Sequence, residues 1–75
     1  MRKTELYAEC DRIAAAWAPH LPYSEDRIAA AMKVFIKAGA SLAAAKRVVS
    51  DAVRFQQADP VAFAQQIVDA AERSK

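Results

Sequence analysis

The chain has 75 residues, 55% of them hydrophobic, and a formal net charge of +2 from 11 Lys and Arg against 9 Asp and Glu. This length allows one domain only, residues 1–75, and buries only about 60% of the surface that the unfolded chain exposes. Because 19 residues are Ala, the core must be thin, and such domains often add a disulfide, a metal or a second subunit. A single Cys and a single His exclude an internal disulfide and a zinc-type ligand set. We therefore expect no metal and no cofactor, and a homodimer or other homo-oligomer stays open.

No uninterrupted apolar run approaches the ~18–20 residues that cross a bilayer, so no transmembrane segment is predicted. The first five residues, Met1 to Glu5, are too polar for the apolar centre of a secretory signal. Together with the single cysteine, these observations favour a reducing, cytoplasmic location.

Apolar residues at helical spacing predict a first helix over about residues 4–18. Thr4 is placed to cap its start, and Glu5 lies in the first turn, where the helix dipole favours a carboxylate. Pro19 ends the helix, because the residue before a proline is pushed out of the helical region. The buried face is predicted to hold Leu6, Cys10, Ile13, Ala14 and Trp17.

A second helix is predicted over about residues 24–38, with Ser24 as its N-cap. Gly39 closes it, because glycine tolerates the left-handed conformation that commonly follows a helix C-terminus. Val34 lies well away from the centre of the apolar face, so we expect it to be an exposed apolar contact. The buried face is predicted to hold Ile28, Met32, Phe35 and Ile36.

A third helix is predicted over about residues 41–57, capped by Ser41, and its two sides differ in character. Val48 and Phe55 widen its apolar side beyond the width that a surface helix needs, so we expect neighbours on two sides and a central position in the fold. The other side carries a basic stripe that must face water or a partner. The apolar side holds Leu42, Ala45, Val49, Ala52 and Val53, and the basic stripe comprises Lys46, Arg47, Ser50 and Arg54.

A fourth helix is predicted over about residues 60–73, because Asp59 is a good N-cap and Pro60 is tolerated at the first helical position. No window alternates with the period of a strand, so the expected fold is an all-α bundle of four short helices with the third helix central. The inner side of the fourth helix is predicted to hold Val61, Ala64, Ile67, Val68 and Ala71, with Phe63 beside them.

Acid–base or nucleophilic catalysis needs a positioned donor, acceptor and orienting group. The chain offers one His, one Cys and one Gly, which provides neither such a set nor a glycine-rich phosphate loop. His20 lies between two prolines, where an exposed loop histidine is expected, and Cys10 on a buried face is expected to fill space in the core. We therefore expect no catalytic residues and no enzyme activity.

Positive charge is concentrated in residues 27–54, which hold six Lys and Arg against Asp51 alone. This distribution suits nucleic acid, an acidic protein surface or plain solubility. Surplus apolar residues beside the stripe favour a protein contact site. The first hypothesis is a non-enzymatic regulator, adaptor or inhibitor that docks on a protein with an acidic or mixed apolar surface, or on itself. The candidate apolar contacts are Val34, Val48, Phe55 and Phe63.

The segment Phe35–Val49, two helices joined by a short turn at Gly39, resembles a DNA-binding helix-turn-helix. The resemblance implies that the basic stripe contacts phosphates and bases, which is the alternative hypothesis. The segment departs from the family at Phe35, where such proteins usually have a small side chain. The first turn of the basic helix, Leu42 to Ala45, also has no polar group that reads a base edge.

Overall fold

The computed structural model describes residues 2–74 and is all-α, as predicted, with no strand in that range. The helices are α1 (Lys3–Trp17), α2 (Glu25–Lys37), α3 (Leu42–Arg54) and α4 (Pro60–Arg73), and a short 3₁₀ turn, η1 (Ala18–His20), follows α1. The Cα atoms extend over 37 × 30 × 16 Å. Helix axes pack about 8–10 Å apart and Cα atoms lie about 2.3 Å from each axis, so the shortest dimension accommodates two layers of helices and no third.

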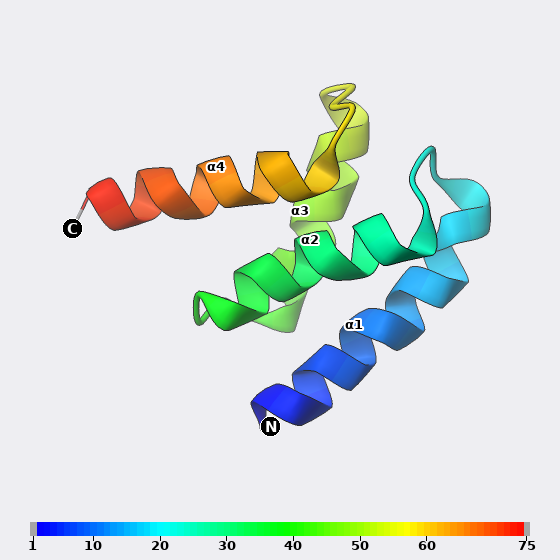
Figure 1. Cartoon of the computed structure of the whole chain (residues 1–75), viewed down its shortest axis with the longest axis horizontal. Helices are drawn as coiled ribbons and strands as arrows, with labels where there is room; N and C mark the ends of the chain where they lie inside the picture. Colours follow the sequence, from blue (N-terminus) through cyan, green and yellow to red (C-terminus); the bar gives the residue numbers. More distant parts are fainter. Residues whose placement is uncertain (1, 75) are drawn as a thin grey trace.

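The central helix is α2, which packs against α4, α1 and α3. In Figure 1, α1 lies on one side of α2 and α4 on the other, while α3 crosses behind. The prediction that the third helix is central is therefore wrong. The reason is that α2 buries two small residues, Ala29 and Ala31, besides its larger apolar side chains, so neighbours approach it from several directions.

The core forms where α1, α3 and α4 meet α2, and no buried polar or charged residue interrupts it within residues 2–74. Cys10 is fully buried in it, as expected, and its thiol is free. Burial raises the pKa of this thiol. Trp17 is only half-buried at the margin of the core. The largest fully buried side chains are Ile28, Met32, Ile36, Val49, Pro60 and Cys10.

Three helices begin at the residues that the sequence predicts as caps. The Ser24 hydroxyl accepts a hydrogen bond from the Arg27 N–H, and the Ser41 hydroxyl accepts one from the Ala44 N–H at 3.1 Å. Asp59 caps α4 through its carboxylate. The first helix differs: Arg2 is its N-cap residue, and no side chain caps the helix start, so the predicted Thr4 cap is wrong.

Both α2 and α3 end in a Schellman motif, in which one residue with positive φ turns the chain. After α2 this residue is Gly39, at φ 94°, as predicted. After α3 it is Gln56, at φ 55°, and the Gln57 N–H donates to the Ala52 carbonyl at 2.8 Å. The third helix therefore ends at Arg54. The prediction placed its end three residues later, because no glycine in the sequence marks this turn.

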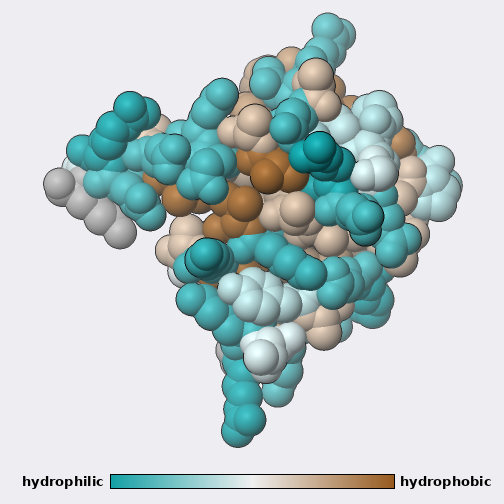
Figure 2. Space-filling view, viewed as in Figure 1, coloured by the Kyte–Doolittle hydropathy of each residue, from teal (hydrophilic) through white to brown (hydrophobic). Residues whose placement is uncertain are grey.

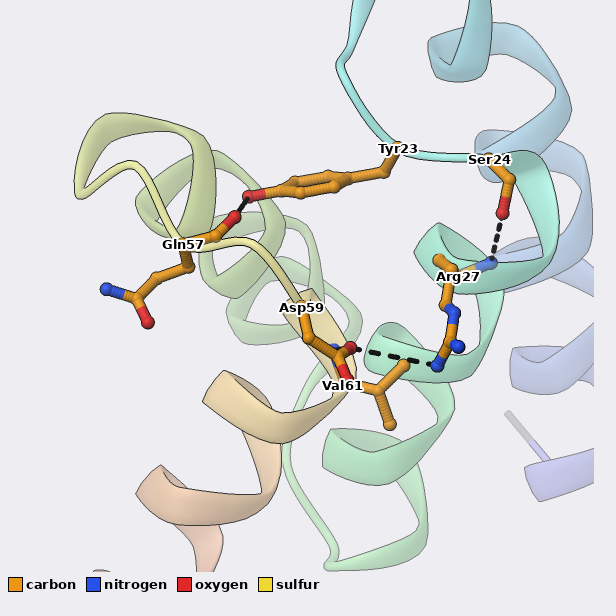
Figure 3. A network of polar contacts seen from close by, with 6 residues as sticks. All are labelled: Tyr23, Ser24, Arg27, Gln57, Asp59 and Val61. Carbon is orange, nitrogen blue, oxygen red and sulfur yellow. Dashed lines mark hydrogen bonds and ion pairs between the residues drawn. The ribbon is translucent and has the colours of Figure 1, made fainter.

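Polar contacts attach the α3–α4 connector to the start of α2 (Figure 3). The Tyr23 hydroxyl, just before α2, donates a hydrogen bond to the Gln57 carbonyl. Arg27 lies 3.8 Å from Asp59, which also accepts from the Val61 N–H at 3.0 Å and so caps α4. The direction in which α4 leaves the connector is therefore fixed by contacts with the first turn of α2.

Opposite effects on stability are expected at the two positions with positive φ. Gly39→Val should lower the free energy of unfolding by ~1–2 kcal/mol, because a Cβ disfavours this backbone conformation even though no atom lies within 4 Å of it. Gln56→Gly should raise the free energy of unfolding by up to ~1 kcal/mol, because it relieves the same strain. Urea unfolding followed by circular dichroism measures both. A neutral Gly39→Val variant would contradict the left-handed helix end.

Loss of the Tyr23 hydroxyl should destabilise the fold and alter its response to alkaline pH. Tyr23→Phe should lower the free energy of unfolding by about 0.5–1.5 kcal/mol at pH 7, because the Gln57 carbonyl loses its donor. Burial raises the pKa of Tyr23 in the folded chain above the ordinary value near 10. Its stabilising contribution is therefore complete below pH ~10 and is lost as the pH rises through the folded pKa. Unfolding curves from pH 7 to pH 11 should show a steeper loss in the unmodified chain than in Tyr23→Phe, and identical slopes would exclude this role.

Candidate functional site

The basic stripe of α3 faces solvent along its whole length. Lys46, Arg47, Ser50 and Arg54 are all exposed, as the sequence predicts. The Ser50 hydroxyl donates to the carbonyl of Lys46 at 3.4 Å, so its proton is directed to its own helix. The three cationic side chains are therefore the main hydrogen-bond donors that the stripe offers to another molecule.

Two carboxylates lie close to the stripe and reduce its net charge. Asp51 lies 3.9 Å from Arg47, whose side chain is 82% exposed, and an exposed pair of this kind contributes no more than about 1 kcal/mol. Glu9 of α1 lies near the other end. Its hydrogen bond with Arg12 lowers the pKa of the Glu9 carboxyl, and the charge of Lys46 lowers it further. The stripe is therefore a mixed surface with a basic excess.

An aromatic pair lies where α3 ends and the chain turns toward α4. The Phe55 side chain is 57% exposed, and its ring centroid lies 6.5 Å from that of Phe63 at an interplanar angle of 52°. On α3, the Arg54 guanidinium carbon lies 5.7 Å from the Phe55 centroid, within cation–π range. We call Arg54, Phe55 and Phe63 the aromatic corner.

Val48 and Val34, the other two residues predicted as apolar contacts, lie outside the aromatic corner. Val48 is 3% exposed and belongs to the core, so its prediction as a surface contact is wrong. The widened apolar side of α3 is covered by α2 and α4, which accounts for its burial. Val34 is half-buried, packs against the core and lines a groove on another face of the molecule.

This groove lies between the C-terminal half of α2 and the middle and end of α4, and Figure 2 shows apolar side chains exposed in it. The sequence analysis did not predict this groove, because Ile67 was expected on the buried side of the fourth helix. In the structure Ile67 is 39% exposed. After Val68 every described residue of α4 is exposed, since the helix extends beyond the neighbours that cover its first turns. The apolar lining of this α2–α4 groove comprises Val34, Phe35, Ala38, Ile67, Val68 and Ala71.

Within residues 2–74 no group of three or more His, Cys, Asp or Glu side chains is placed to hold a metal ion. None of the helices in this range is both long and apolar enough to span a bilayer. His20 is exposed, as expected, although it lies in η1 rather than in an irregular connector.

Comparisons of the chain with protein-family models, with curated proteins and with solved structures gave no match. Function is therefore inferred from the chain's own residues and their geometry.

Proposed function

We propose that this protein is a non-enzymatic helical interaction module that acts as a regulator, adaptor or inhibitor by docking on a protein partner. Its docking surface would combine the basic stripe of α3 with the aromatic corner. The observation that carries the proposal is the position of Phe55, which is 57% exposed beside Arg54 and Phe63. A large exposed aromatic side chain next to cationic groups is typical of a contact site.

The composition of the aromatic corner suits a binding hot spot. Arginine and large aromatic residues are enriched in the buried centres of protein interfaces. Full burial of a Phe side chain contributes about 1.5–3 kcal/mol, and Arg54 and Phe63 flank the ring on which this burial would occur. A complementary partner would offer an apolar pocket for Phe55 and carboxylates for Arg47 and Arg54.

The backbone of the corner is well constrained before any partner binds. Phe55 is the C-cap residue of α3, and its N–H donates to the Asp51 carbonyl at 2.8 Å. The next turn is fixed by the Schellman motif at Gln56 and by the Tyr23 contact with Gln57. A preordered backbone reduces the entropy that is lost on binding.

A reducing, cytoplasmic location is part of the same proposal. It is supported by Cys10, which is a free thiol within the hydrophobic core. Proteins that fold in oxidising compartments at this size commonly rely on disulfides, and this chain has a single cysteine.

DNA binding through the same stripe is the alternative function. It is favoured by the crossing of α3 behind α2 directly after the Gly39 turn, and by the exposure of the stripe. Against it, Asp51 lies close to Arg47, and the Ser41 hydroxyl at the start of α3 is occupied in capping Ala44. Phe35 is half-buried against the core and lines the α2–α4 groove, whereas helix-turn-helix proteins usually have a small side chain at this position.

An affinity pull-down of the tagged chain from a native lysate, with and without nuclease, tests both hypotheses. We expect one stoichiometric protein that survives nuclease and is lost with Phe55→Ala and with Arg54→Glu. Because Phe55 is largely exposed, Phe55→Ala should retain the helical circular dichroism. Arg2→Glu is the matched control, since it reverses a charge at the exposed start of α1 and should leave the capture unchanged.

Three results would contradict docking through the aromatic corner. Unfolding of Phe55→Ala would show that the ring belongs to the core. Retention of the captured protein by both variants would exclude this surface. Recovery of nucleic acid that depends on Arg47, with an affinity that falls steeply as salt rises, would establish the alternative.

A further inference from the structure

The α2–α4 groove is a second surface, separate from the aromatic corner. Its walls are the C-terminal half of α2 and the middle and end of α4, and Tyr7 of α1 contributes to one margin. Ile67, 39% exposed, is one of only two large hydrophobic residues that are exposed within residues 2–74, and the other is Phe55. The groove therefore holds apolar surface that the chain's own fold leaves uncovered (Figure 2).

The wall made by α4 is itself a helix with an uncovered apolar stripe. Only Pro60 and Ala64 of α4 are buried, and residues 69–74 are all exposed. Short helices are marginal in water and gain most of their stability by packing an apolar face. The distal half of α4 therefore presents Ile67 and Ala71 as exposed apolar residues.

Opposite charges line the two walls without meeting. Lys37 of α2 and Glu72 of α4 both line the groove, yet no ion pair joins them, and within residues 2–74 neither forms an ion pair elsewhere. Lys33 on the same wall is already paired with Asp11 at 2.7 Å. Among the described residues, each wall of the groove therefore carries one charge outside any ion pair, positive on α2 and negative on α4.

We propose that the distal half of α4 from a second copy of this chain occupies the groove, forming a twofold homodimer. In a twofold interface every contact occurs twice, so Ile67 of each copy would lie on the apolar lining of the other, and Lys37 of each would face Glu72 of the other. The chain supplies both the apolar groove and an apolar helix with the complementary charge, which is why a second copy fits as the occupant. The thin core of this small domain gives dimerisation a clear benefit for stability.

Sedimentation velocity of the full chain from about 1 to 500 μM is the first test. The mass should rise with concentration from 8.2 kDa to twice that value. Ile67→Asp should abolish the rise and keep the helical circular dichroism, because Ile67 is outside the core. Phe55→Asp is the matched control on the other exposed hydrophobic residue, and it should dimerise as the unmodified chain does.

A charge exchange tests the orientation of the two copies. Lys37→Glu and Glu72→Lys should each raise the dissociation constant about tenfold or more, because each places like charges against one another. The double variant should restore dimerisation. If the double variant dimerises no more tightly than the single variants, Lys37 of one copy does not face Glu72 of the other.

Other results would overturn the dimer itself. A chain that stays monomeric at every concentration would exclude the dimer. This holds even if Ile67→Asp releases a captured protein, because the groove would then be occupied by a different protein. A dimer that survives Ile67→Asp and is lost with Phe55→Asp would place self-association at the aromatic corner. None of these outcomes is decided by the pull-down with Phe55→Ala, so the two proposals fail independently.

Discussion

Close packing on several sides of α2 is the constraint on which the rest of the structure depends. Ala29 and Ala31 are buried beside larger apolar side chains, and their small size lets neighbouring helices approach closely. The other three helices are arranged around this one, and the connector before α4 is attached to its first turn through Tyr23 and Arg27. Substitution of these alanines by larger residues would push the neighbouring helices away from α2, and a fold this thin has no other core to replace the lost contacts.

The same arrangement leaves two apolar regions without cover. Because α3 packs its wide apolar side against α2 and α4, its opposite face and its C-terminal end remain free, and Phe55 lies at that end. Because the buried residues of α4 lie in its first two turns, its distal half remains largely exposed as well. A fold only two helix layers deep cannot bury every large apolar side chain, and the exposed ones lie at these two places. Both proposals for binding originate from this limit.

Much of the fold was predictable from the sequence because its signals are local. Ser24, Ser41 and Asp59 cap the predicted helices, and Gly39 ends α2, since caps and helix ends depend on a few neighbouring residues. The end of α3 was missed because Gln56 holds a positive φ without being glycine. That conformation is supported by tertiary contacts around the connector, which a sequence pattern does not reveal.

The candidate site was predictable only in part. Exposure of the basic stripe follows from helical periodicity alone. The prominence of Phe55 depends on the end of α3 at Arg54, which the sequence prediction placed three residues later. The burial of Val48, the groove beside Val34 and the exposure of Ile67 depend on which helix covers which face. Periodicity identifies an apolar face but not its neighbour, so the central position was assigned to the helix with the widest face instead of the helix with most neighbours.

Native-state hydrogen exchange, measured residue by residue at low concentration, tests the central role of α2 most directly. Amides in α2 between residues 28 and 36 should exchange slowest, with opening free energies near that of global unfolding, and amides of residues 69–73 should exchange fastest among the helices. The slowest exchange in α3, with α2 opening in smaller local steps, would contradict this account and would make the third helix the centre of the fold.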